Sequence, residues 1–109
     1  MAFSKARLYN RRARITALYF RVLNHPARQE ILLKLAKDGP CSVEELLQDH
    51  PISGSTMSRH LEKLRAVNFI SYKEKTPYII YAIEPKKIRR AKKFMAAFYN
   101  TLEKLMETK

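Results

Sequence analysis

The chain has 109 residues, 46% of them hydrophobic, which is enough for one domain with a modest core. Its 22 lysines and arginines outnumber its 10 aspartates and glutamates, and the net charge of +12 favours a polyanionic partner such as nucleic acid or an anionic membrane surface. The one cysteine, Cys41, excludes an intrachain disulfide and fits a reducing cytoplasm, where we expect the protein to reside. No apolar run approaches the roughly 18 residues that a membrane span needs.

The arginine-rich start of the chain predicts a basic amphipathic helix over residues 4–23. No acidic residue precedes Glu30, and five apolar side chains recur mostly at helical spacing: Leu8, Ile15, Leu18, Tyr19 and Val22. A second helix of about three turns follows, because Pro26 suits a first helical position and Gly39 followed by Pro40 provides a stop.

The next two predicted helices are short and tightly joined. In CSVEELLQDHP, Ser42 and Glu45 have the spacing of a capping box, which starts a third helix that ends before Pro51. The link PISG leads into GSTMSRHLEKLRAVNF, a fourth helix with Ser53 as its predicted N-cap. Two short helices joined in this way indicate a helix-turn-helix.

The fourth helix has one apolar face and one polar face. Met57, Leu61 and Leu64 share a narrow arc of the helical wheel. The opposite arc and its flanks carry polar side chains: Ser55, Thr56, Ser58, Arg59, Glu62 and Lys63. Hydroxyls and an arginine near a helix N-terminus suit a DNA duplex, since arginine can contact a guanine edge and the positive end of the helix dipole favours phosphate. The alternative is that the serines only cap the helix. We expect His60, between the arcs, to pack against a neighbouring helix with one ring nitrogen hydrogen-bonded, in preference to the alternative of a DNA contact.

The remaining segments predict a hairpin and a long helix. FISYKEKTPYIIYAI alternates around a break at EKTP, where Pro77 favours an edge or loop position, and Lys73 and Lys75 flank the turn. The helix that opens at Pro85 has an apolar heptad seam: Ile88, Ala91, Met95, Phe98, Leu102 and Leu105. We therefore predict a mainly α protein with a small β-hairpin, a winged helix-turn-helix of about five helices in a single domain over residues 1–109.

Three stretches together resemble one family of bacterial regulators. They are LNHPARQEILLKLAKDGPCSVEELL, ISGSTMSRHLEKLRAVNFI and YIIYAIEPKKI, which cover roughly residues 23–88 and are similar to the ArsR/SmtB transcriptional regulators. The resemblance implies a homodimeric winged-helix repressor that binds double-stranded DNA at an operator and leaves it when an effector, unknown here, binds. It also implies no membrane and no cofactor.

The resemblance assigns residues to two surfaces. The DNA-facing positions fall on the fourth helix and the wing: Ser55, Thr56, Ser58 and Arg59, with Lys63 on the same exposed arc, and Lys73 and Lys75. The dimer interface falls on the terminal helices, 4–23 and 85–107, for which the candidates are Leu8, Ile15, Tyr19, Met95, Phe98, Leu102 and Leu105. The sequence departs from the family at Gly54, where many members have a glutamine, so that side-chain contact to a base cannot form.

Metal sensing is not expected, because the Cys-x-Cys pair and the Asp and His pairs of the family's metal sensors are absent. Cys41 precedes a predicted helix, whose dipole could lower the thiol pKa for a redox role, although a lone cysteine in a loop is more often an inert small residue. Aromatic residues of the terminal helices could line an organic-ligand pocket, but such residues more often form a dimer core: Tyr9, Tyr19, Phe20, Phe94, Phe98 and Tyr99.

Three other functions compete with DNA regulation. A winged helix can serve as a protein or RNA interaction module, in which case the basic charge is only a solvating surface. An enzyme is not expected, because no paired carboxylates, no nucleophile with a base and acid, and no phosphate-binding loop can be recognised. A peripheral membrane role would use the basic amphipathic terminal helices, whose aromatic faces fit a dimer better.

Overall fold

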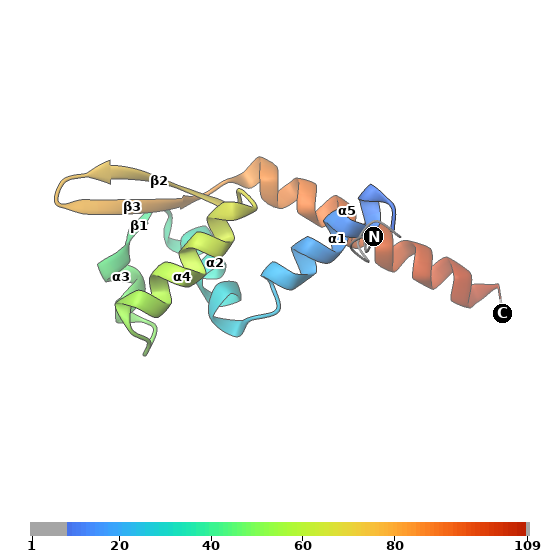
Figure 1. Cartoon of the computed structure of the whole chain (residues 1–109), viewed down its shortest axis with the longest axis horizontal. Helices are drawn as coiled ribbons and strands as arrows, with labels where there is room; N and C mark the ends of the chain where they lie inside the picture. The colour runs from blue at the N-terminus through green and yellow to red at the C-terminus, as the bar shows by residue number, and fades with distance from the viewer. Residues whose placement is uncertain (1–8, 109) are drawn as a thin grey trace, which may run out of the picture.

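The computed structural model describes residues 9–108, which form helices around one small sheet (Figure 1). The elements in chain order are α1 (Arg11–Val22), α2 (Pro26–Asp38), β1 (Cys41–Ser42), α3 (Val43–Gln48), α4 (Gly54–Ala66), β2 (Ile70–Lys75), β3 (Tyr78–Ile83) and α5 (Pro85–Glu107). The order is that of a winged helix-turn-helix, as the sequence predicts, with α3 and α4 as the helix-turn-helix and β2–β3 as the wing. None of the described helices is long and apolar enough to cross a membrane.

The start of α1 differs from the prediction. Residues 4–8 of the predicted helix lie outside the described residues, but Tyr9 and Asn10 are described and are not helical. Asn10 is the N-cap, since its Oδ1 accepts a hydrogen bond of 2.8 Å from the backbone N of Ala13. The spacing of apolar residues indicates which face of a helix is buried but not where the helix begins. The first helical residue depends on the N-cap, and the Asn10 side chain makes α1 begin at the next residue, Arg11.

The sheet has a strand that the sequence does not reveal. Its order is β1-β3-β2, fully antiparallel, with Cys41 paired to Tyr81 and Ser42 paired to Ile80. Two residues are too few to give an alternating pattern, so only the tertiary contact defines β1. Ser42 also begins α3, because its Oγ accepts from the backbone N of Glu45 and the Glu45 carboxylate accepts from the backbone N of Ser42, which confirms the capping box.

The core lies where α2, α3 and α4 meet the base of the wing and the first half of α5. Met57, Leu61 and Leu64 are all buried, which confirms the predicted apolar arc of α4. Phe69, at the junction of α4 and β2, stacks on Tyr19 of α1 with the ring centroids 5.6 Å apart. Burial of each such side chain stabilises the fold by about 1.5–3 kcal/mol, so this cluster fixes α4 against the rest of the domain.

Candidate nucleic-acid interface

The hydroxyl groups at the start of α4 form one small hydrogen-bonded network. Ser53 is the N-cap, and its Oγ accepts from the backbone N of Thr56 at 3.2 Å. The same oxygen lies 3.1 Å from the Oγ of Ser55 and 3.0 Å from the Oγ1 of Thr56. The hydroxyls of Ser55 and Thr56 therefore help to hold the first turn as well as facing the surface, so the capping role and the exposed position exist together.

The exposed face of α4 beyond its first turn is cationic. Ser58, Arg59 and Lys63 are exposed, while Met57 on the opposite side is fully buried. Among the described residues, the ion pairs involve only Lys34, so no carboxylate holds Arg59 or Lys63. A helix fixed along one side by its core contacts and bearing free cations on the other presents a rigid surface to a polyanion.

The wing carries its predicted lysines on its outer face. In the β2–β3 register, Lys73 pairs with Ile80 and Lys75 with Tyr78, and successive residues alternate between the two faces of the hairpin. Tyr72 lies on the other face, where the guanidinium of Arg65 from α4 sits 4.8 Å from its ring centroid. Figure 1 shows the tip of the wing and the start of α4 at the same end of the molecule, although they do not touch there.

His60 is on the buried side of α4 and contacts α2. Its side chain is only 7% exposed, and its Nδ1 accepts a hydrogen bond of 3.3 Å from the Nε of Arg28. Burial lowers the pKa of His60 below its usual 6.5, and His25 and Arg28 add to the shift. The predicted packing role of His60 is thus confirmed. Arg28 was missed by sequence reasoning, although it lies in the P-x-R part of the family-like opening, and its second donor bonds the carbonyl of Val22 at 3.1 Å.

Cys41 does not have the surroundings of a reactive thiol. It is 2% exposed in β1, and its Sγ lies 3.3 Å from the carbonyl oxygen of Gly39, to which it donates. Burial raises the pKa of the Cys41 thiol, with Glu45 adding to the rise. The proposed lowering by a helix dipole is therefore wrong, because the residue is held inside the sheet instead of at an open helix start. Within residues 9–108 no three His, Cys, Asp or Glu side chains gather as a metal site would require.

The candidate interface residues divide into two groups. Leu8 lies outside the described residues, and Ile15 and Met95 are half-buried against the core. Tyr19 is only 9% exposed because its own chain covers it, with Phe69 stacked on it and the Phe94 ring 5.9 Å away, so it has little surface left for a second subunit. The remaining seam residues are open to solvent, with exposures of 48% at Phe98, 43% at Leu102 and 60% at Leu105.

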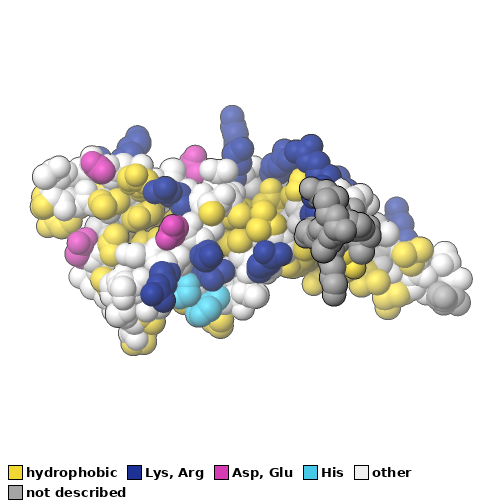
Figure 2. Space-filling model, in the orientation of Figure 1, with side chains coloured by type: hydrophobic (Ala, Val, Ile, Leu, Met, Phe, Trp, Pro, Cys, Tyr) yellow, Lys and Arg dark blue, Asp and Glu magenta, His cyan; other side chains and the backbone are white. Residues whose placement is uncertain are grey.

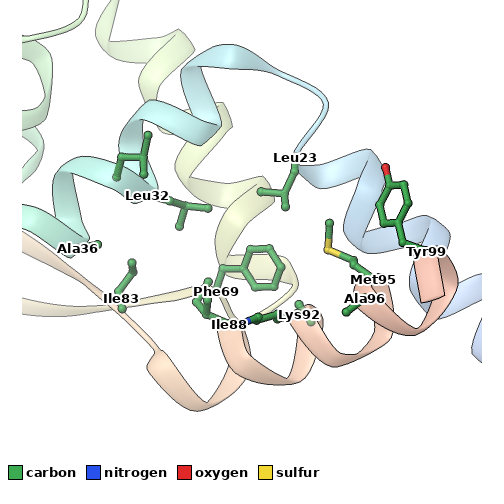
Figure 3. A pocket seen from close by; sticks show the side chains of 12 residues that line it. Leu23, Leu32, Ala36, Phe69, Ile83, Ile88, Lys92, Met95, Ala96 and Tyr99 are labelled. Carbon is green, nitrogen blue, oxygen red and sulfur yellow. The ribbon is translucent and has the colours of Figure 1, made fainter. Parts of the chain in front are cut away.

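The aromatic residues of the terminal helices mostly pack on one another. The Phe20 ring lies 5.9 Å from both the Phe98 and Tyr99 rings, in edge-to-face geometry. An apolar cavity of about 400 Å³ opens nearby, between α2, the end of β3 and α5 (Figure 3). Leu23, Phe69 and Met95 line it, and Lys92 is the charged residue in its wall. The cavity has no acid and base pair with which to do chemistry.

Comparison with known proteins assigns the fold to a family. Residues 23–72 match the model of a helix-turn-helix domain, whereas curated protein sequences give no match. The solved structure of NolR from Sinorhizobium fredii is 27% identical and covers 93% of this chain and 95% of its own, with a TM-score of 0.66. The transcriptional repressor BigR from Xylella fastidiosa is 26% identical over 83% of this chain and 89% of its own, at a TM-score of 0.63.

The fold match is tighter still for a more distant sequence. An ArsR-like transcriptional regulator from Rhodococcus sp. RHA1 is 19% identical and covers 88% of this chain and 90% of its own, with a TM-score of 0.72. The helix-turn-helix match and these structural relatives agree with the exposed cationic helix and the wing. The chain is therefore a DNA-binding transcriptional regulator with a helix-turn-helix domain and the winged helix-turn-helix fold, and it is similar to regulators of the ArsR type.

Proposed function

We propose that α4 enters the major groove of an operator and that the wing contacts the flanking backbone. The observation that carries this proposal is the exposed row of Ser58, Arg59 and Lys63 on a helix whose other side is locked into the core by Met57 and Leu61. A helix anchored in this way keeps its reading side chains in a fixed position, which sequence discrimination requires.

The side chains have different roles in this proposal. Arg59 reads a base edge, since its planar guanidinium can make two hydrogen bonds to guanine. Ser58 adds a short polar contact, and Ser55 and Thr56 contact the duplex at the start of the helix while they remain in the cap network. Three lysines contact phosphates and set the position of the protein on the duplex: Lys63, Lys73 and Lys75.

We further propose that the working form is a homodimer. The end of α5 projects beyond the other described elements in Figure 1, and its apolar side is open at Phe98, Leu102 and Leu105. Three such side chains in a row on one helix face are unfavourable in water, and a second copy related by a two-fold axis would cover both at once. Ile15 of α1 and Met95 of α5 would border that contact.

Repression is the mode of action that the arrangement favours. Two α4 helices presented by one dimer would bind two half-sites and obstruct transcription from an overlapping promoter. The BigR relative is itself described as a repressor. Release by an effector, as in the resembled family, completes the proposal.

The test uses operators selected from randomised duplex DNA by the full-length protein. Arg59→Ala should weaken binding to the best site by about 1–3 kcal/mol per subunit and reduce discrimination at particular base pairs. Lys73→Ala and Lys75→Ala should weaken binding to every duplex and reduce the salt slope by roughly one unit for each contact. Selection of no operator, or tighter binding of single-stranded RNA than of duplex, would favour the interaction-module alternative instead.

A control substitution on the opposite face of α4 distinguishes a loss of base recognition from a loss of stability. Met57→Ala should lower the stability by about 2–5 kcal/mol because it leaves a cavity in the core. The molecules that remain folded should keep the base preferences of the parent protein. If Arg59→Ala binds its best site as tightly and as selectively as the parent, the start of α4 has only a capping role and the proposal is wrong.

A further inference from the structure

The start of α5 and the start of α1 together build a cationic pocket far from the start of α4. The pocket has a volume of about 530 Å³, and five of its six lining residues are basic. We name it the basic pocket, and its lining residues are Arg12, Lys86, Arg89, Arg90, Lys93 and Phe94. The four basic residues from α5 follow the i, i+3, i+4, i+7 spacing, so they occupy one face of that helix.

The two arginines that stack on Phe94 hold the pocket together. The guanidinium carbon of Arg12 lies 4.7 Å from the Phe94 ring centroid, and that of Arg90 lies 5.4 Å from it. Stacking on an aromatic face fixes the plane of a guanidinium but leaves its N–H donors free at the edges. The ring therefore positions cations from two helices without neutralising either.

No carboxylate balances this charge. The first nine residues of α5, 85–93, contain six lysines and arginines and no acid, and α1 contains four arginines and no acid. The ion pairs of the described residues are confined to Lys34 with Asp38 and Asp49. Like charges at i, i+4 repel, and cations at a helix N-terminus also oppose the helix dipole. An anionic ligand would relieve both penalties.

The basic pocket and the start of α4 lie on different parts of the molecule. Figure 1 shows α4 beginning at the lower left of the molecule and α5 beginning at its upper edge. In Figure 2, Lys and Arg side chains gather along that upper edge, over the region where α5 and α1 lie. The pocket therefore lies away from the start of α4, the part of the molecule that we propose contacts the operator.

We propose that the basic pocket binds the phosphate backbone of a second, separate segment of duplex DNA, so that the regulator joins two duplexes. This inference rests on the proposed operator binding. Duplex DNA fits because its phosphates follow one another at short spacing, as the cations do along α5, and because a cluster of cations binds a phosphate backbone whatever its sequence.

The experiment is a bridging assay with the full-length protein. An operator duplex is immobilised and saturated with protein, and capture of a labelled duplex without an operator is then measured. The parent protein should capture the second duplex, with a steep salt dependence. The triple variant Lys86→Gln, Arg89→Gln and Lys93→Gln should lose about tenfold or more of that capture and roughly one unit of salt slope per contact, while its operator affinity changes by less than about threefold.

The control variant removes the same charge elsewhere. Arg21→Gln, Lys37→Gln and Lys104→Gln replace three basic residues outside the pocket, which lie in the last turns of α1, α2 and α5. This variant should capture the second duplex as well as the parent does. The pocket variant keeps the stacked arginines Arg12 and Arg90, and equal thermal midpoints show that it is folded.

Each other result overturns the inference. If the operator is bound but the second duplex is not captured by the parent, or is captured equally by the pocket variant, the basic pocket has no such role. Loss of capture in the control variant as well would mean that net charge alone is responsible. Binding of vesicles containing phosphatidylglycerol that is lost only in the pocket variant, with no capture of DNA, would assign the pocket to a membrane surface. Failure to select any operator refutes the proposed function itself.

Discussion

Arg28 donates a hydrogen bond of 3.3 Å through its Nε to the Nδ1 of His60 and so connects α2 to the buried side of α4. The same arginine binds the Val22 carbonyl at the end of α1. One side chain thereby connects three helices. The bond requires His60 to be neutral, because Nδ1 can accept only when it carries no proton.

This bond predicts a pH dependence of stability. The pKa of His60 in the folded protein lies below its usual 6.5, so the unfolded chain binds more protons in that range and the free energy of unfolding falls as the pH is lowered below about 6.5. Above that pH the contribution is complete. Urea unfolding from about pH 7.5 to pH 5 should show the fall in the parent protein and a flatter curve in His60→Asn, which keeps an acceptor but does not titrate. Equal slopes in the two proteins would contradict the assignment.

A charge placed on the exposed apolar face of α5 should disrupt the proposed homodimer. Phe98→Glu should split the homodimer, because a carboxylate would have to be buried without a partner between two subunits. Asn100→Glu adds the same charge in the same turn but on the other side of the helix, and it should remain dimeric. Light scattering measures both masses. A dimeric and fully folded Phe98→Glu protein would move the interface elsewhere.

Substitutions at Gly54 should be tolerated by the fold, and a longer side chain there should alter the base preference of the protein. A side chain at this first helical position would meet no heavy atom within 4 Å. Gly54→Ala should raise the stability by about 0.5–1 kcal/mol, since alanine favours the helix more than glycine does. Gly54→Gln should fold equally well and add a preference of about 1 kcal/mol or more at one base pair of each half-site, measured by operator selection. An unchanged preference would mean that this position does not face the bases.

The Cys41 thiol should react slowly with thiol reagents in the folded protein. Its sulfur is buried and burial raises its pKa, so the thiolate fraction and the access to reagents are both low. An aromatic disulfide reagent at neutral pH should modify the folded protein far more slowly than the protein in urea. Complete modification of the folded protein during mixing would restore the redox hypothesis.

The sequence predicts the local part of this structure well and the long-range part poorly. The caps at Ser42 and Ser53 and the buried arc of Met57 and its neighbours depend on spacing within one element, and all are confirmed. The bond between Arg28 and His60 joins residues 32 positions apart, and β1 exists only through its pairing with β3, so neither leaves a periodic signal. Tyr19 shows the related difficulty that helical spacing identifies an apolar face without saying which neighbour covers it.

The sequence also does not reveal how side chains combine on the proposed DNA-facing surface and in the basic pocket. The hydroxyls at the start of α4 were predicted as either caps or contacts, whereas their mutual hydrogen bonds make them a preassembled set around Ser53. The basic pocket combines residues from both ends of the chain, Arg12 and the start of α5, and only the folded chain brings them to one ring. The net charge indicated an anionic partner but not where the charge collects.

Ser42 belongs to the sheet through its pairing with Ile80 and to α3 through its capping hydroxyl. Because Ser42 belongs to both elements, no linker residue separates the sheet from α3. A tilt of the wing would therefore also displace the first turn of α3. The angle between the wing and the helix-turn-helix is thus set by this joint, and the distance between α4 and the wing, the two parts that we propose contact DNA, is fixed within the monomer.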